Sequence, residues 1–400
     1  YAHLADLHIG GWREPKLKDL NAEVFVKAMD MCIAENVDFI LFAGDLFNTA
    51  LPAVEKLNLV AKKLHDLKQK NIPMYIIPGS HDYSPSGKTM IDVLESAGLF
   101  TNVCKGEVIN SKLRLHFTAD KKTGAKITGV PGKKGMLDRI YYEDLDREPL
   151  ESEPGYKIFM FHTSLTELKP KHLTDMESQP VSLLPTNFDY YAGGHVHHKM
   201  EFRSPTHKLV TQPGALFPNN FAELEKYGHG GFYLIDNSTI NWLPVKLRER
   251  IALEISCDGR SAGEIMDLAM AEANQHDIEN SIVTLRFSGT ITGSLSSIPF
   301  NELFSRLSDR SAFIVLKNTT ALHSEEYEEI KIDSSASIEE LESALINEHA
   351  QQLTLFTKEK EIELTKSLIA ALTTEKREGE TVPDFERRVR ENSMKVLEID

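Results

Sequence analysis

Short apolar runs alternate with segments of helical spacing from residue 1 to about residue 243. In two segments the apolar residues recur at intervals of three and four, the period of a helix with one buried face. These residues are Phe25, Ala28, Met29 and Cys32, then Leu57, Val60, Ala61 and Leu64. The apolar run 37–43 between them is typical of a buried strand, as are residues 74–78, 157–161 and 190–192. This alternation predicts a layered α/β domain.

A second unit is predicted between about residues 247 and 316. Its strand candidates alternate or form a short apolar run: Ile251, Leu253 and Ile255, then Val283, Leu285 and Phe287, then residues 313–316. Residues 262–273 and the set Phe300, Leu303, Phe304 and Leu307 have helical spacing. The order predicts a small βαβαβ domain.

The last part of the chain reads as a polar linker followed by about three helices. Ser337 and Glu340 can form a capping box before a stripe that includes Leu341 and Ile346. Leu364, Leu368 and Leu372 make the next stripe, and Pro383 opens a last helix. The predicted divisions are a main domain over residues 1–245, a small α/β domain over 246–318, a linker over 319–336 and a helical segment over 337–400.

Composition fits an ordinary globular protein: 41% of the 400 residues are hydrophobic and 26% are charged. The longest apolar runs are strand-sized, so we predict no membrane span. The chain opens at Tyr1 inside a predicted strand without the pattern of a secretory signal, which favours a cytoplasmic location. The net charge of -15 counts against a nucleic-acid partner. Acidic residues are dense in the last third, however, and DNA contact needs only a local basic face.

Five polar motifs carry the candidate chemistry, and each follows a predicted buried strand. If these strands are neighbours in a sheet, their polar ends converge at one edge, where open α/β sheets place ligand sites. The motifs are Asp6-Leu7-His8, Gly44-Asp45, Gly79-Ser80-His81-Asp82, Phe161-His162 and Gly193-Gly194-His195-Val196-His197.

The spacing within these motifs favours a metal site. Asp6 and His8 lie two apart in a segment expected to be extended, which places both side chains on one side. His195 and His197 have the same spacing, and Asp45 is the natural carboxylate to bridge two cations. Mixed imidazole and carboxylate ligands suit zinc, manganese or iron. Two such ions could activate a water and clamp a phosphoryl centre, so hydrolysis by in-line attack is expected.

The motif set resembles the calcineurin-like metallophosphoesterase superfamily, whose pattern is D-x-H, G-D, G-N-H-D/E, a later His and G-H-x-H. The resemblance implies a layered β-sandwich flanked by helices and two divalent ions. One ion would be held by Asp6, His8, Asp45 and His197, and the second by Asp45, His162 and His195. His81 would protonate the leaving oxygen and stabilise the transition state.

One position departs from the superfamily pattern. Ser80 replaces the Asn of G-N-H and offers a shorter side chain with a hydroxyl. The second ion would then be held through water or more weakly, or Ser80 would bind it directly after a small backbone shift. Asp82 is expected to orient His81 or to close the loop.

Further segments narrow the resemblance to the SbcD-type (Mre-type) nuclease of double-strand-break repair. They are Asp45-Leu46-Phe47-Asn48, Ile77-Pro78-Gly79, Gln212-Pro213-Gly214-Ala215 and residues 230–236, so the motifs cover about residues 1–236. The resemblance implies a manganese-dependent DNA nuclease that dimerises, uses the small domain as a DNA-positioning cap, and docks its C-terminal helices on an SMC-like ATPase of the SbcC type. It also implies a nucleoid location, or a nuclear one in a eukaryote.

Candidate DNA contacts are the lysines interspersed with glycines at Lys121, Lys122, Lys133 and Lys134, together with Arg248. A solvated charge run explains the same lysines. Two other functions remain open for the whole chain. One is a small-molecule phosphodiesterase or phosphatase, which would not need the tethered helices. The other is a catalytically weak scaffold that binds DNA or an ATPase, with Ser80 as its signature.

Overall fold

The computed structural model describes residues 1–84, 89–169, 176–236, 239–325, 346, 357–377 and 380–397. The chain divides into two compact units. The first comprises Tyr1–Ile255, Asp267–Phe287 and Phe300–Thr320, and the second comprises Ser256–Met266, Ser288–Pro299 and Ala321–Asp400. The domain boundaries expected from the sequence stay predictions.

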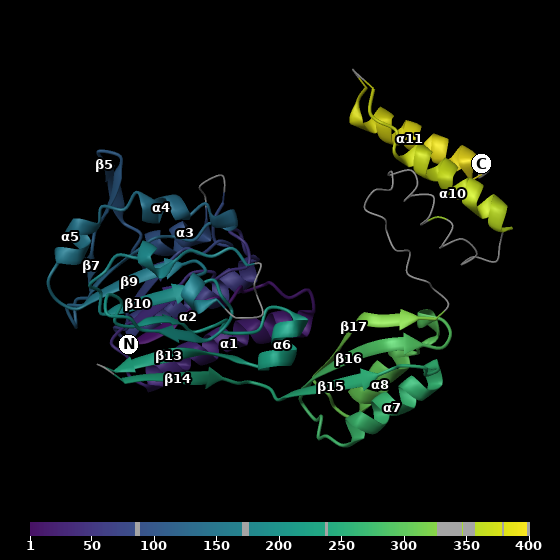
Figure 1. Cartoon of the computed structure of the whole chain (residues 1–400), viewed down its shortest axis with the longest axis horizontal. Coiled ribbons are helices and arrows are strands. Elements are labelled where there is room, and N and C mark those ends of the chain that lie inside the picture. The colour runs from purple at the N-terminus through teal and green to yellow at the C-terminus, as the bar shows by residue number, and fades with distance from the viewer. Residues whose placement is uncertain are drawn as a thin grey trace. The chain divides into compact units, whose positions relative to one another are not determined.

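A six-stranded sheet in the order β14-β13-β1-β2-β3-β4 forms the first layer of strands. Figure 1 labels its strands β13 and β14. β1 to β4 run parallel, whereas β13 and β14 are antiparallel to their neighbours. The strands are β1 (Ala2–Leu4), β2 (Ile40–Ala43), β3 (Met74–Ile77), β4 (Thr101–Asn102), β13 (Gly230–Asp236) and β14 (Thr239–Val245).

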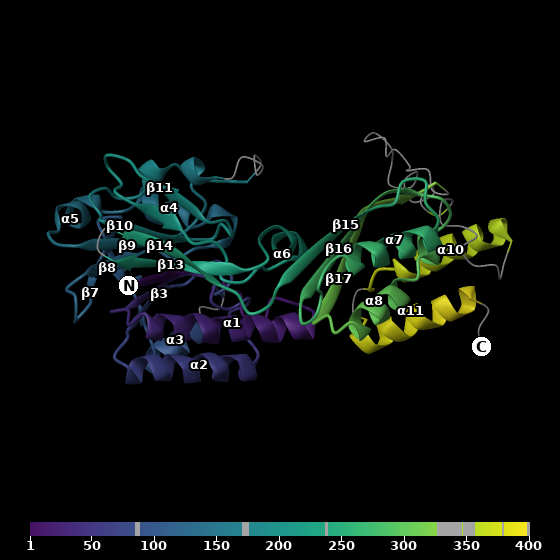
Figure 2. The same ribbon diagram turned by 90° about the horizontal axis from the view of Figure 1, so that it is seen from below.

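Two long helices cover one face of this sheet, α1 (Pro15–Ala34) and α2 (Val54–Gln69). Figure 2 shows them together on one side of β13 and β14. Alternate strand residues such as Phe42 and Ile76 pack against Phe25 of α1 and Leu64 of α2 in one core. Burial of each large apolar side chain contributes about 1.5 to 3 kcal/mol. The helical spacing read from the sequence therefore marks the face that covers the sheet.

A second six-stranded sheet, in the order β11-β12-β10-β9-β8-β7, packs on the other face of the first. Leu41 and Ile77 of the first sheet meet Ile158 and Tyr190 of the second in a shared core. β12, β10, β9 and β8 run parallel. The strands are β7 (Thr118–Ala119), β8 (Lys126–Gly129), β9 (Lys157–His162), β10 (Tyr190–Gly194), β11 (Met200–Phe202) and β12 (Val210–Gln212).

The outer face of the second sheet carries a third core that includes Phe159 and Tyr191. Short helices supply its cover through Tyr142 and Leu150. The layers are thus helices, sheet, sheet and helices, which confirms the predicted α/β fold of a layered β-sandwich flanked by helices. The remaining elements of this part are α3 (Met90–Ser96), β5 (Gly106–Ile109), β6 (Lys112–Leu115), α4 (Arg139–Glu143), α5 (Arg147–Ser152) and α6 (Phe221–Tyr227).

The predicted βαβαβ order is confirmed between residues 250 and 324. A three-stranded sheet in the order β15-β16-β17 alternates along the chain with two helices. The elements are β15 (Arg250–Ser256), α7 (Ala262–Asn274), β16 (Ile282–Ile291), α8 (Phe300–Asp309) and β17 (Ile314–Ser324).

Two helices are described near the end of the chain, α10 (Lys358–Leu372) and α11 (Val382–Val396). Pro383 lies in the first turn of α11, as predicted, and the Thr381 side chain accepts a hydrogen bond from the Asp384 amide. The helix predicted at residues 337–346 and most of the predicted linker lie outside the described residues. Among the helices that the structure describes, none is long and apolar enough to cross a membrane.

Candidate metal centre

The five polar motifs lie at the carboxyl ends of strands in both sheets, rather than at the edge of one. Asp6 and Asp45 follow β1 and β2 of the first sheet, whereas His162 ends β9 and His195 follows β10 of the second. The two sheet ends meet through hydrogen bonds: the His195 amide donates to both Asp6 carboxylate oxygens at 2.9 and 3.0 Å. The motifs of the two sheets therefore form one site.

Potential metal ligands in this site fall into three overlapping groups, within each of which the candidate ligand atoms lie no more than 4.8 Å apart. Every group contains a carboxylate and at least one imidazole. The groups are Asp6, His8 and His197; Asp6, Asp45 and His162; and His8, Asp45 and His81. Asp6, His8 and Asp45 each belong to two of the groups. Ligand groups that overlap in this way could hold two neighbouring ions.

The backbone reaches this arrangement by a route that the sequence did not suggest. Asp6, His8 and Asp45 have φ angles of 53°, 50° and 57°, in the left-handed region. The predicted extended conformation of the Asp6–His8 segment is therefore wrong. Hydrogen bonds between the loops hold it in place, with the His8 amide donating to the Asp45 carbonyl at 2.9 Å. Such conformations cost about 1 to 3 kcal/mol each and persist where surrounding contacts impose them.

Glycines make the space for the His162 ring. A Cβ on Gly44 would lie 2.2 Å from His162 Nδ1, and one on Gly132 would lie 2.5 Å from its Cδ2. His162 Nδ1 lies 2.8 Å from the Ala43 carbonyl, to which its N–H can donate, and Nε2 lies 3.1 Å from Asp45 Oδ2. A metal-binding histidine usually donates from one ring nitrogen to a backbone carbonyl in this way, which directs its other nitrogen, here the one facing Asp45, toward the ion.

The charges of the site are balanced within it. Burial raises the pKa of Asp6 to about 6. Burial alone would lower the pKa of His162, but the Asp45 carboxylate beside it raises that pKa to about 10. Among the described residues, neither Asp6 nor Asp45 forms an ion pair with a lysine or arginine, and both face histidines. Buried carboxylates with only imidazoles as counter-charges fit divalent cations, which would replace the proton on His162.

Residues 1–199 match the calcineurin-like phosphoesterase family. The chain therefore carries a calcineurin-like phosphoesterase domain. This membership confirms the superfamily resemblance of the motifs and supports a metal-dependent hydrolase.

Curated relatives of the chain have sequence identities below 30%. The DNA double-strand break repair protein Mre11 of Methanococcus maripaludis is 28% identical over 60% of this chain and 63% of its own length. The protein of the same name from Saccharolobus solfataricus is 27% identical over 59% of this chain and 60% of its own. The uncharacterized metallophosphoesterase YhaO of Bacillus subtilis is 26% identical over 59% of this chain and 56% of its own length. The chain thus matches about six-tenths of each relative.

The Gly79–Asp82 loop of the phosphoesterase domain lies beside Asp45. Ser80 Oγ is 3.4 Å from Asp45 Oδ2, and the His81 amide donates to Asp45 Oδ1 at 2.7 Å. The Asp82 carboxylate accepts hydrogen bonds from the backbone amides of Leu46, Phe47 and Gly79. Asp82 thus clamps its own loop to the one that follows β2, which is the loop-closing role considered for it.

His195 is a predicted metal ligand that lies beside the ligand groups that the structure describes but belongs to none of them. Its ring lies beside that of His162, with centroids 5.2 Å apart, but it is absent from the three ligand groups of the described residues. Its φ of 90° is left-handed. A role for His195 in binding the second ion therefore stays a proposal.

Two supporting residues were missed in the sequence. Glu223 Oε1 lies 3.0 Å from His197 Nδ1, and this contact raises the pKa of His197 against the effect of burial. Glu223 also accepts a hydrogen bond from the side chain of Asn220, the N-cap of α6. In the sequence this capping pattern explains Glu223 without any role in the metal centre. Gln212 is fully buried, and its amide donates to the carbonyls of Thr163 and Gly194, each at 3.1 Å. The sequence did contain a signal for Gln212, because it begins the segment Gln212-Pro213-Gly214-Ala215 that carries part of the family resemblance.

Replacing Glu223 with alanine is expected to weaken metal binding and hydrolysis about 10- to 100-fold, because His197 loses the partner that orients its ring. Metal titration by calorimetry would measure the first effect. Glu225→Ala on the same helix serves as the control, since Glu225 pairs with Arg286 and not with His197. Equal losses in both variants would assign the effect to α6 folding instead.

The lysines proposed as DNA contacts do not form one group. Lys121 and Lys122 precede β8, and Lys122 Nζ pairs with Asp38 at 2.6 Å, whereas Lys133 and Lys134 follow the strand. Because Gly132 packs on His162, only the pair after β8 lies near the metal centre. Arg248 donates to Asn280 Oδ1 at 2.6 Å and stacks on Phe313.

Proposed function

We propose that this phosphoesterase domain hydrolyses the phosphodiester bonds of DNA with two divalent ions, preferably manganese. The observation that carries the proposal is the convergence of six polar side chains, from five strand ends, on ligand groups that share Asp6, His8 and Asp45. The names of the break-repair relatives support DNA as the substrate.

Each side chain has a proposed role. Asp6, His8, Asp45 and His197 would hold one ion, while Asp45, His162, His195 and Ser80 would hold the other. The ions would supply an activated water and stabilise charge on the phosphate oxygens. His81 Nδ1 lies 2.9 Å from the Asn48 carbonyl, to which its N–H can donate, so Nε2 is the atom that would transfer a proton to the leaving oxygen. Its ring lies beside His8, with centroids 4.6 Å apart.

The proposal also assigns surfaces of the chain to DNA and to an ATPase partner. Lys133 and Lys134 would contact the DNA backbone near the metal centre, and the small α/β domain would act as a cap. The apolar hollow lined by Leu372 of α10, Phe385 and Val389 of α11, and Leu397 directly after α11 would receive an SMC-like ATPase of the SbcC type. A homodimer and action at the nucleoid complete the proposal.

Cleavage of end-labelled single- and double-stranded DNA, beside a chromogenic phosphodiester, tests the reaction. We expect cutting with manganese, little without metal, and a loss of about 100-fold or more in His81→Ala, the range of general acid catalysis. His65→Ala, on the exposed side of α2, is the matched control. Absence of manganese-dependent cutting of any DNA would contradict the proposal.

The same assay separates the alternatives. Hydrolysis of the small diester alone would favour a small-molecule phosphodiesterase, and no turnover of either substrate would favour a scaffold. Ser80→Asn tests the second ion, because an amide oxygen reaches one atom further than the Ser80 hydroxyl. A gain in activity at limiting manganese would identify Ser80 as the weak ligand, whereas a loss would show that its hydroxyl is needed.

A further inference from the structure

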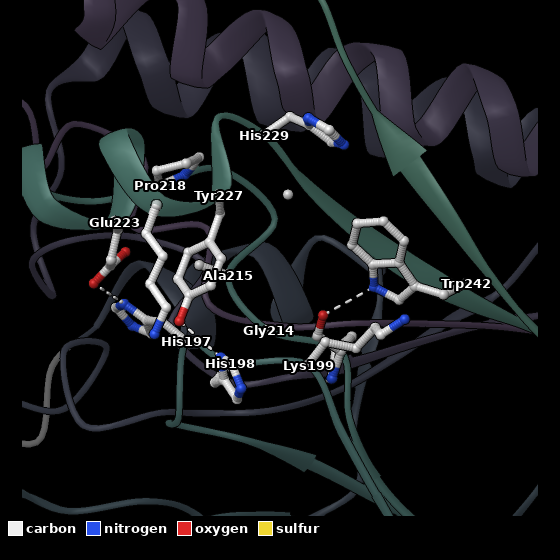
Figure 3. Close-up of a pocket in the computed structure, with 13 residues that line it drawn as sticks. His197, His198, Lys199, Gly214, Ala215, Pro218, Glu223, Tyr227, His229 and Trp242 are labelled. Carbon is white, nitrogen blue, oxygen red and sulfur yellow. Dashed lines mark hydrogen bonds and ion pairs between the residues drawn. The ribbon is translucent and has the colours of Figure 1, made fainter. Parts of the chain in front are cut away.

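A cavity of about 470 Å³ adjoins the metal centre on the side of His197. Its walls come from the loop after β10, the loop after β12, α6 and the hairpin of β13 and β14. Figure 3 shows Trp242, His229 and Tyr227 on different sides of the hollow. These residues lie within the first compact unit.

The aromatic wall of the cavity is fixed in position. The Trp242 indole N–H donates to the Pro213 carbonyl at 3.0 Å. Gly231 leaves the space for the indole, because a Cβ there would lie 2.5 Å from Trp242 Cζ2. On another side, the Tyr227 hydroxyl lies 2.7 Å from His198 Nδ1. Rigid ring faces of this kind offer a stacking surface for a planar ligand.

The cavity is also cationic. Lys199 Nζ lies 5.1 Å from the centre of the Trp242 ring, and Lys226 lines another side. Glu223 is the one acidic residue of the lining, and its carboxylate is engaged by His197 and the Asn219 amide. A ligand that combines a flat ring with a negative charge suits this wall better than an apolar one.

His197 connects this cavity to the metal centre. One ring nitrogen, Nε2, lies 3.1 Å from His8 Nε2 within the ligand cluster, while the same residue lines the cavity. A phosphate bound at the cluster would therefore have the cavity directly beside it, because His197 belongs to both.

We propose that this cavity binds one unpaired nucleotide of the substrate strand, next to the bond that is cut, with its base against Trp242 and its phosphate near Lys199. This assignment rests on the proposed nuclease function for its place in the reaction, but nucleotide binding can be measured without catalysis. It predicts a preference for ends or strands with at least one unpaired base, since a base that stacks on Trp242 has to leave its own base pair.

Calorimetric titration of the metal-free protein, in excess chelator, with 2′-deoxyadenosine 5′-monophosphate tests the site. Stacking on an aromatic side chain is strong enough that Trp242→Ala should weaken binding roughly ten-fold or more, whereas Trp242→Phe should retain most of it. Lys199→Glu should weaken binding by a similar factor without affecting the fold, because Lys199 is exposed. Lys62→Glu on α2, also exposed, is the matched control.

Three results would overturn the proposal: no binding to the unmodified protein, equal affinity in Trp242→Ala, or equally tight binding of inorganic phosphate. The last would identify an anion site without base recognition. DNA cleavage assays separate this proposal from the nuclease itself. Nucleotide binding that depends on Trp242, in a protein that cuts no DNA, would retain the cavity assignment and remove the nuclease, and the reverse pair of results would remove the cavity alone.

Discussion

Asp45→Asn is expected to lower hydrolysis by at least about a thousand-fold, the largest effect of any substitution in this domain. The carboxylate takes part in two of the three ligand groups and contacts both His8 and His162. An amide keeps the size of the side chain and tolerates the left-handed backbone, but it removes the charge that would bridge two ions. Metal-ion stabilisation of several kcal/mol corresponds to losses of this size.

Steady-state hydrolysis of a chromogenic diester and the metal content after dialysis would measure this effect. The control is Asp267→Asn, an exposed carboxylate on α7. The melting temperature in chelator should fall, because the buried His162 loses the carboxylate that stabilises its charged form. Activity within ten-fold of the unmodified protein would remove Asp45 from the centre of the site.

Gly194→Ala is expected to destabilise the fold and the metal centre together. The added Cβ would lie 2.1 Å from the Ala43 carbonyl and 2.8 Å from His162 Nδ1, where His162 makes its hydrogen bond to the backbone. Because the nearest atom belongs to β2 of the other sheet, the two sheets have to separate locally. We expect a loss of about 1 to 3 kcal/mol in the free energy of unfolding, as for overpacked cores, with weaker metal binding.

Denaturant unfolding of the metal-free and metal-loaded protein would resolve the two parts of this effect. Gly263→Ala is the matched control, because nothing lies within 4 Å of a Cβ there and the residue is in α7. That change should stabilise the protein slightly, by about 0.4 to 1 kcal/mol. A neutral Gly194→Ala would mean that the interface between the sheets is more compliant than its packing implies.

The sequence predicted the convergence of the site because its motifs directly follow short buried strands. Asp45 and His162 each lie at or just beyond the end of a four- or six-residue strand, so the strand fixes where the side chain begins. The apolar alternation of residues such as Leu41 and Phe42 also marked which strand faces meet the helices and which meet the second sheet. The pattern of apolar and polar residues along each strand was therefore sufficient to predict where the site residues lie and which way the strand faces point.

Features that depend on contacts between distant segments could not be predicted. The partition of the motif strands between two sheets is decided by pairing, as in the parallel match of Gly194 with His162. Glu223 reaches His197 only because α6 packs beside the loop after β10, and within the sequence Glu223 reads as a helix-capping residue. The Trp242 cavity is likewise assembled from four separate segments.

The left-handed backbone at Asp6, His8 and Asp45 bears on how such a chain would change over generations. Glycine would fit the local geometry at these positions with less strain, so each of the observed residues carries a cost in folding. A lineage released from selection for hydrolysis should therefore replace them early, before the surrounding core drifts. Their joint presence in this chain is what continued selection on the reaction would maintain.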